Sequence, residues 1–197
     1  MPRENSNGKP DIIIILSGKR KCGKDYVANI LLERYGKDDA VILRLSGPLK
    51  ERYALENNLN YEKLLDSSEY KEIFREKMIK WGEAIRNQDP GYFCRHAIQQ
   101  SCAKSKRIWI VSDARRKTDI EFFKTNYPDE TYTVRINASD VVRQKRGWNY
   151  AKGVDDCESE CGLDDYNQWN LEIYNDNDEQ MLEGIQKVFL STKINVK

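Results

Sequence analysis

The sequence predicts an α/β fold in three layers, a parallel sheet of five strands flanked by helices, and three observations support it. Apolar runs alternate with amphipathic helical stretches along the whole chain, which is the order of elements in a parallel sheet with right-handed crossovers. The first run, 12–16, is apolar throughout, as are strands that are buried on both faces of such a sheet. A glycine-containing loop at 18–25 follows that strand directly.

The loop at 18–25 has a glycine, four residues and then Gly-Lys, the pattern of a phosphate-binding loop. Backbone N–H groups of such loops point inward, and the next helix, predicted over 23–35, directs its positive dipole end at the same anion. Lys24 would place a cation on the β- and γ-phosphates of a nucleotide. Asp25 stands where Ser or Thr usually binds magnesium. The alternative is a lysine-rich surface turn, but four cations in six residues repel one another without an anion.

The next part of the chain is predicted to be helical and carries further cations. A strand over 41–45 ends at Ser-Gly-Pro, which starts a helix with Lys50. A long amphipathic helix over 69–87 places Lys71 and Arg75 four residues apart, on one face. This face is either a solvated cationic surface or a clamp on a second anionic substrate, and spacing alone favours the solvated surface.

The third strand, 108–111, is followed by charged residues that are expected to lie in the site. Ligands of open α/β sheets bind beyond the carboxyl ends of the strands. Asp113 is therefore predicted to bind magnesium. Arg115 and Arg116 match bidentate clamping of a phosphate. The alternative is a capped turn with exposed arginines.

The C-terminal part of the sheet follows the same alternation. A helix over 119–126 precedes a strand over 132–136, and Ser139 begins a helix that carries Arg143 and Arg146. These two arginines are three residues apart and can reach one ligand together.

A lid is predicted over 143–166, because 147–166 is rich in glycine and acidic residues and lacks periodicity. Its acidic residues would repel phosphates, so we expect them to pair with basic residues elsewhere or to face solvent. The last strand is predicted over 169–174, Asn175 ends it, and a helix over 179–190 closes the fold.

Composition narrows the class of protein further. The formal net charge of +1 gives no sign of a nucleic-acid or membrane partner, and residues 1–10 read as a flexible, polar N-terminus without a signal region. Five scattered cysteines indicate reduced thiols and a cytosolic compartment. His96, on a helix predicted over 92–102, is the only histidine, so catalysis must proceed largely without histidine.

Several motifs together resemble animal phosphomevalonate kinase. The loop at 17–25 carries the resemblance, and 153–164, Gly-Val-Asp-Asp-Cys-Glu-Ser-Glu-Cys-Gly-Leu-Asp, is the most specific match. Shorter matches lie at 45–50, 81–83, 89–91, 111–116 and 146–148. The resemblance covers essentially the whole chain from Ile12 to the final helix.

The resemblance implies a P-loop fold like that of nucleoside-monophosphate kinases, in one domain over 1–197. It implies transfer of the γ-phosphoryl of ATP to (R)-5-phosphomevalonate, with Mg²⁺, in the mevalonate route to isoprenoids. It also implies an acceptor-binding helical region at 46–104. An aspartate at Asp25 is usual in this family. Some members end in a peroxisomal-type tripeptide, which 195–197 does not match, so cytosol is expected.

The expected roles divide the site residues into groups. Catalysis is assigned to Lys24, Asp25, Lys19, Arg20, Arg115 and Arg116, and magnesium binding to Asp25 and Asp113. ATP binding is assigned to Gly18, Lys19, Arg20, Lys21, Cys22, Gly23, Lys24, Asp25, Arg143, Arg146 and Asn175. Binding of phosphomevalonate is assigned to Lys50, Lys71, Arg75, Arg86, Arg115, Arg116 and Asn175.

Two other functions remain open at this point. One is a kinase for a different small phosphorylated acceptor, such as a nucleoside monophosphate. The other is a nucleotide-dependent regulatory switch, although the Asn-Lys-x-Asp signature of guanine-binding switches is absent from the sequence. The expected partners are small molecules only, and a monomer is expected.

Overall fold

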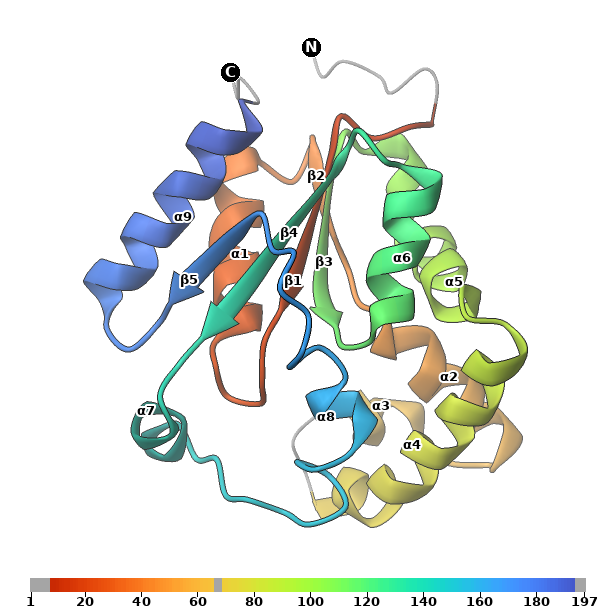
Figure 1. Ribbon diagram of the computed structural model, residues 1–197. Helices are drawn as coiled ribbons and strands as arrows, with labels where there is room; N and C mark the ends of the chain where they lie inside the picture. The colour runs from red at the N-terminus through yellow and green to blue at the C-terminus, as the bar shows by residue number, and fades with distance from the viewer. Residues whose placement is uncertain (1–7, 66–68, 194–197) are drawn as a thin grey trace.

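A single parallel sheet organises the molecule. The computed structural model describes residues 8–65 and 69–193, so most of the N-terminus predicted at 1–10 and the residues 195–197 lie outside it. Five parallel strands form the sheet in the order β2-β3-β1-β4-β5 (Figure 1). The strands are β1 Ile12–Ser17, β2 Ala40–Leu43, β3 Ile108–Ala114, β4 Thr131–Asn137 and β5 Leu171–Tyr174. The predicted five-stranded parallel sheet is confirmed.

Helices connect the strands and cover both faces of the sheet (Figure 1). They are α1 Lys24–Tyr35, α2 Ser46–Glu56, α3 Tyr61–Leu65, α4 Glu69–Gln88, α5 Tyr92–Gln100, η1 Ala103–Ser105, α6 Lys117–Asn126, α7 Asp140–Lys145, α8 Glu158–Cys161 and α9 Asp178–Thr192. Helices α1 and α9 lie on one face, and α5 and α6 lie on the other. The prediction of three layers is therefore confirmed.

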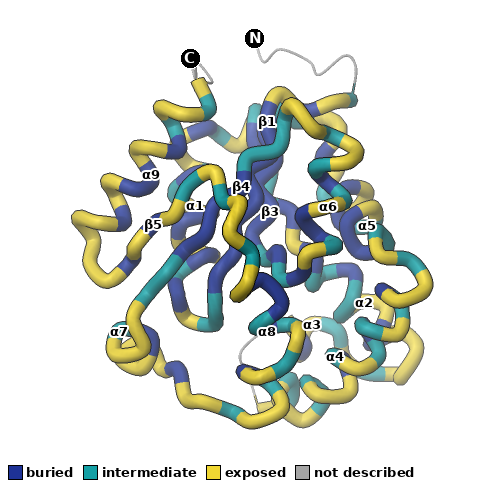
Figure 2. The backbone as a smooth tube through the Cα atoms, in the orientation of Figure 1, coloured by how far each residue is buried: buried dark blue, intermediate teal, exposed yellow. Residues whose placement is uncertain are grey.

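The side-chain alternation of β1 divides the core in two. Ile12, Ile14 and Leu16 pack against α1 and α9, whereas Ile13 and Ile15 pack against α5 and α6. All five are buried, and Figure 2 shows the middle of the sheet as mostly buried. A strand covered on both sides in this way must be apolar at every position, which explains the unbroken aliphatic run.

Helices α2, α3 and α4 form a separate small core beside the sheet. Tyr53, Leu64 and Met78 are its buried centre, one from each helix. The polar composition of 57–68 did not indicate α3. Asn60 starts it by accepting a hydrogen bond from the backbone N–H of Lys63 at 3.1 Å, and Leu64 anchors it in the core.

The last strand begins later than predicted, at Leu171 rather than at Trp169. The indole N–H of Trp169 donates to the carbonyl of Tyr166 at 2.9 Å, and its ring packs edge-on against the Tyr166 ring. Asn170 uses its side chain as well as its backbone to pair with Thr133. These side-chain contacts replace the regular strand ladder at the two positions.

No helix within residues 8–65 and 69–193 combines the length and the apolar character that crossing a membrane requires.

Candidate active site

The turn between β1 and α1 requires its two glycines. Gly18 and Gly23 have positive φ values of 152° and 96°, which L side chains rarely adopt. A Cβ at Gly18 would collide with the Ile136 carbonyl, and one at Gly23 would collide with the Asn175 amide. The loop at 18–25 therefore wraps closely against the ends of β4 and β5, at the centre of the carboxyl edge of the sheet.

Lys24 is enclosed by this loop. The residue is only 7% exposed, and its Nζ donates hydrogen bonds to the carbonyls of Gly18 at 2.5 Å and Lys19 at 3.1 Å. Burial lowers the pKa of its ammonium group. No carboxylate pairs with Lys24 within the described residues. Its charge is held by neutral carbonyl oxygens, so it is available to an arriving phosphate.

Asp113 has a structural role that the sequence argument held only as an alternative. Its Oδ1 and Oδ2 accept hydrogen bonds from the backbone N–H groups of Leu45 at 2.7 Å and Ser46 at 3.0 Å. The carboxylate thus caps the start of α2 and ties β3 to the helical region. Each oxygen keeps a second lone pair, so this capping does not prevent metal binding.

Lys50 of α2 is influenced by the charges of residues on several other elements. Burial lowers the pKa of Lys50, and the charges of Asp113 and Asp25 oppose that shift while those of Arg44 and Arg75 add to it. Asp25 is exposed and forms no ion pair in the part of the chain that the structure describes. Mg²⁺ is usually held by one or two carboxylates together with substrate phosphates and water, and its binding by Asp25 and Asp113 stays a prediction.

The two arginines after β3 differ in their surroundings. Arg115 pairs with Glu160 of α8 and donates to the carbonyl of Ser159 at 3.1 Å. Arg116 is 8% exposed and pairs with Glu83 of α4. Its Nε has no hydrogen-bond partner among the residues that the structure describes. The structure therefore directs Arg115 toward the phosphate-binding loop and Arg116 into a buried contact between helices.

The other cations predicted to bind phosphomevalonate are distributed over α4. Arg86 is buried, pairs with Asp119 at 2.6 Å and lies 4.8 Å from the centre of the Phe93 ring. Arg75 pairs with Glu72 on the same helix. Glu72 is also influenced by the charges of Arg20 and Lys71, so this part of α4 lies near the loop. Binding of substrate by these residues stays a prediction.

Helix α7 already contacts the phosphate-binding loop. Arg143 Nε donates to the Arg20 carbonyl at 2.8 Å, and its guanidinium lies 3.9 Å from the centre of the Trp148 ring. Arg146 donates to the Cys22 carbonyl at 3.3 Å and to the Asn175 carbonyl at 2.9 Å. Both arginines are thus held on the outer side of the loop by carbonyl oxygens.

Asn175 completes this contact from the end of β5. It is 3% exposed, and its Nδ2 donates to the Cys22 carbonyl at 2.8 Å. The structure brings Arg146, Asn175 and the loop together, as the predicted ATP-binding set requires. Lys21, with φ 61°, is exposed at the tip of the loop.

The acidic residues of the predicted lid either pair with cations or face solvent, as expected: Asp155, Glu160, Asp164 and Asp165 form ion pairs, and Asp156 and Glu158 are exposed. Asp155 pairs with Arg20 at 3.0 Å, and Asp164 pairs with Lys19 at 2.7 Å and with Arg135 at 3.0 Å. Asp165 pairs with Lys117. Arg20 and Lys19 belong to the phosphate-binding loop, so 155–164 lies directly against this loop. Within this segment, 158–161 forms the short helix α8, which the lack of periodicity did not predict.

These contacts place the loop at 18–25 and residues of 143–166 together at one edge of the sheet, and the comparisons identify the family. A family model described as phosphomevalonate kinase matches residues 16–129. The chain belongs to the phosphomevalonate kinase family. A curated phosphomevalonate kinase of Drosophila melanogaster is 40% identical over 171 residues, which are 86% of this chain and 89% of that relative. The predicted family, and with it a phosphotransferase of the mevalonate pathway, is confirmed.

Solved structures with low identity share the fold. TT1252 from Thermus thermophilus aligns with a TM-score of 0.59 at 16% identity, over 95% of this chain and all of that one. A shikimate kinase from Bacteroides thetaiotaomicron aligns with a TM-score of 0.52 at 16% identity, over 93% of this chain and 99% of that one. These likenesses support the P-loop kinase fold of this member of the family.

Sequence reasoning missed two residues near the predicted site, Trp148 and Arg44. Trp148 donates its indole N–H to Asp155 at 3.0 Å, and so joins the start of the predicted lid to its acidic part. Arg44 directly follows β2, and its positive charge helps to lower the pKa of Lys50. Arg44 could have been found by the rule that identified Asp113, because both follow the carboxyl end of a strand. The Trp148 contact depends on the fold of the lid and has no sequence signal of its own.

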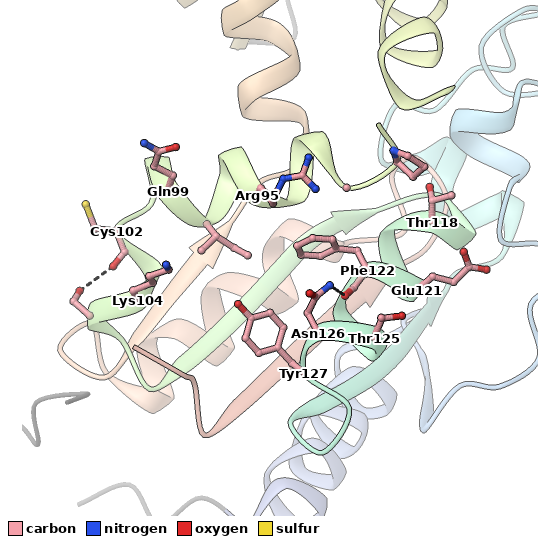
Figure 3. A pocket seen from close by; sticks show the side chains of 14 residues that line it. Arg95, Gln99, Cys102, Lys104, Thr118, Glu121, Phe122, Thr125, Asn126 and Tyr127 are labelled. Carbon is pink, nitrogen blue, oxygen red and sulfur yellow. Dashed lines mark hydrogen bonds between the residues drawn. The ribbon is translucent and has the colours of Figure 1, made fainter. Parts of the chain in front are cut away.

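A pocket of about 1010 Å³ lies away from this site, between α5, η1 and α6 (Figure 3). Its walls include Ile98, Phe122 and Tyr127, with Arg95 and Lys104 among its charged lining. None of the residues predicted for catalysis or substrate binding lines it. The pocket is therefore separate from the site predicted at the carboxyl edge of the sheet.

Proposed function

We propose that this chain transfers the γ-phosphoryl group of ATP to the phosphate of (R)-5-phosphomevalonate at the carboxyl edge of the sheet. The observation that supports it most is the loop at 18–25, which encloses the ammonium group of Lys24 at the carboxyl edge of the sheet in a chain of the phosphomevalonate kinase family. The cations of α4 and the residues after β3 would then hold the second phosphorylated substrate beside this loop.

The phosphates of ATP would bind the backbone N–H groups of the loop at 18–25 and the ammonium group of Lys24, which exchanges its carbonyl contacts for phosphate oxygens. Arg143, Arg146 and Asn175 would hold the outer side of the nucleotide site. Because the loop is already braced by these three side chains, it needs little rearrangement when ATP binds.

The acceptor would bind to the helical region, with Arg115, Lys50 and Arg75 near its phosphate. Phosphoryl transfer needs in-line alignment and dispersed positive charge more than a strong base. The acceptor phosphate has a second pKa of about 6, so it is already an anionic nucleophile at neutral pH. This explains a site without histidine: His96 stacks on Tyr92 in α5 instead.

Mg²⁺ would neutralise charge on the β- and γ-phosphates. Asp25 and Asp113 are the residues proposed to hold it. We further propose that the protein is a cytosolic, single-domain monomer without nucleic-acid or membrane partners, in which 143–166 acts as the lid.

The experiment that tests this function measures ADP formation with phosphomevalonate, with nucleoside monophosphates and without an acceptor. We expect rapid ADP formation from ATP when phosphomevalonate is the acceptor, and not with the nucleoside monophosphates or without an acceptor. Preference for a nucleoside monophosphate would instead identify a kinase for a different acceptor, and slow hydrolysis that no acceptor stimulates would identify a nucleotide switch.

Replacing Asp25 with asparagine is expected to lower kcat strongly and to shift its magnesium dependence to higher concentrations. The amide keeps the shape of the side chain but removes the charge that attracts the metal. ATP binding in the absence of metal should change little. A magnesium titration of kcat checks this, with Asp38→Asn, an exposed residue beyond α1, as the control; an unaltered titration would contradict the role of Asp25.

Arginine-to-lysine changes should separate Arg115 from Arg116. Lysine cannot reproduce a bidentate fork. We expect Arg115→Lys to raise the KM for phosphomevalonate at an unchanged melting temperature, because Arg115 points toward the loop. We expect Arg116→Lys to lower the melting temperature, because Arg116 is buried against Glu83. Steady-state kinetics with thermal melts decide this, and an unaffected KM in both variants would remove the pair from the acceptor site.

A further inference from the structure

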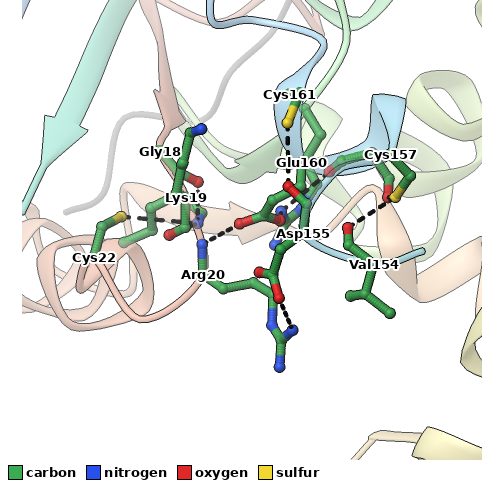
Figure 4. Close-up of polar contacts among 12 residues, drawn as sticks. Gly18, Lys19, Arg20, Cys22, Val154, Asp155, Cys157, Glu160 and Cys161 are labelled. Atoms are coloured by element: carbon green, nitrogen blue, oxygen red, sulfur yellow. Dashed lines mark hydrogen bonds and ion pairs between the residues drawn. The ribbon is translucent and has the colours of Figure 1, made fainter. Parts of the chain in front are cut away.

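Glu160 has contacts that differ from those of the other acidic residues of the lid. Figure 4 shows its carboxylate beside the phosphate-binding loop. One oxygen accepts a hydrogen bond from the backbone N–H of Arg20, and the other pairs with the guanidinium of Arg115. The side chain is only 3% exposed. An anionic group is therefore buried against a backbone N–H group of the loop that binds phosphates.

The two donors that Glu160 contacts belong to opposite sides of the site. The Arg20 N–H group belongs to the loop that holds ATP, and Arg115 belongs to the side assigned to the acceptor. A group that contacts both lies between the two substrates. In the kinase reaction that position must accommodate phosphate oxygens, because the transferred phosphoryl group passes between donor and acceptor.

A phosphate and the Glu160 carboxylate cannot occupy this position together. Both are anions, and placing like charges side by side in a binding site costs several kcal/mol. Neighbouring contacts strengthen the conflict, since Asp155 and Asp164 also pair with loop cations, Arg20 and Lys19. Substrate binding must therefore displace Glu160 from Arg20 and Arg115.

We propose that Glu160 occupies, in the ligand-free protein, the position that a substrate phosphate takes in the reacting complex, and that its displacement releases Arg115 to bind that phosphate. Glu160 is then a positioning residue that acts through Arg115. It keeps the loop and Arg115 ordered before substrates arrive, and it lowers the affinity for them. This inference rests on the proposed function, because it takes Arg115 to serve the acceptor.

The test compares Glu160→Gln with the wild type. Glutamine keeps a hydrogen-bond acceptor for the Arg20 N–H group but carries no charge. Calorimetric titrations with ATP, with phosphomevalonate and with inorganic tripolyphosphate measure Kd. We expect the variant to bind at least one substrate roughly tenfold more tightly, equivalent to about 1.4 kcal/mol. A larger gain for ATP would place Glu160 on a nucleotide phosphate, and a larger gain for phosphomevalonate would place it on the acceptor phosphate.

Glu158→Gln is the matched control, because Glu158 is an exposed residue of the same short helix. It should leave every Kd unchanged. Kinetics provide a second measurement: loss of a competing carboxylate should lower KM, whereas loss of a purely structural brace should raise KM and lower the melting temperature. Unchanged or weaker binding of both substrates by Glu160→Gln would overturn the proposal.

Hydrogen exchange on the wild type tests the proposal even if the variant does not fold. Tripolyphosphate alone should accelerate exchange over 158–162, because it displaces Glu160 and releases α8 from the loop. Unchanged or slower exchange there would contradict displacement. The proposed function can fail separately: absence of phosphomevalonate turnover by the wild type would overturn the acceptor assignment but leave the tripolyphosphate result interpretable.

Discussion

Replacing Lys24 with methionine is expected to abolish turnover while the protein stays folded. The ammonium group of Lys24 is the cation that the loop encloses most closely, and methionine keeps the aliphatic stem but removes the charge. Loss of such a group from a site of this kind costs a factor of about 100 to 1,000 in kcat, or more when substrate positioning also fails. Steady-state assays of ADP formation check this.

The same substitution should also lower the melting temperature slightly. Without the Lys24 ammonium, the carbonyls of Gly18 and Lys19 lose a hydrogen-bond donor. An unsatisfied buried group costs about 1–3 kcal/mol, which for a chain of this size is a few degrees. Lys37→Met, in an exposed position at the opposite end of α1, is the control and should change neither quantity. Normal activity in Lys24→Met would remove the loop from the catalytic site.

Replacing Arg146 with alanine is the second change with a large expected effect. An arginine delivered to the developing charge of phosphoryl transfer contributes about a thousandfold or more to kcat. Arg146 also donates to the carbonyls of Cys22 and Asn175, so its loss should loosen the loop and raise the KM for ATP. Lys145→Ala, which removes an exposed cation of the same helix, should retain activity. Near-normal kcat in Arg146→Ala would exclude this arginine from the transition state.

Hydrogen exchange over 143–166 tests whether the lid responds to substrates. With ATP and phosphomevalonate both bound, we expect stronger protection across this range than in the ligand-free protein, except over 158–162, where the displacement of Glu160 opposes it. Equal protection in the two states would rule out ligand-driven closure. Tripolyphosphate alone has the opposite expected effect over 158–162, so the two measurements report separate events.

The sheet and the phosphate-binding loop could be predicted from the sequence because their signals are local. Five consecutive aliphatic residues at 12–16 do not suit a strand with one solvent-exposed face, so they predict a strand that is buried on both faces. The glycine spacing of the residues that follow predicts a tight turn. The acidic composition of 155–165 was enough to predict pairing with cations or exposure to solvent, but not that two of these cations, Lys19 and Arg20, belong to the phosphate-binding loop.

What the sequence could not give is the choice of partner for each charge. Arg115 and Arg116 are adjacent in the chain, but they point into different surroundings because Arg116 begins α6 and packs against Glu83. The capping role of Asp113 depends on α2 starting beside β3, and the residues adjacent to Asp113 in the sequence do not indicate this position. Pairings across more than a hundred residues, such as that of Arg20 with Asp155, arise only in the assembled fold.

The strand order has a consequence for how this chain acquires its fold during synthesis. Ile12 of β1 pairs with Ile108 of β3, and Ile13 pairs with Thr131 of β4, so both neighbours of the first strand are made long after it. Until β3 has been made, at residue 114 of 197, the aliphatic run of β1 has no permanent partner, and it lacks its second partner until β4 has been made. Folding that depends on such distant contacts is slow, and unpaired apolar strands aggregate. Early stop codons or stalled translation before β4 should therefore yield an insoluble product rather than a smaller folded domain.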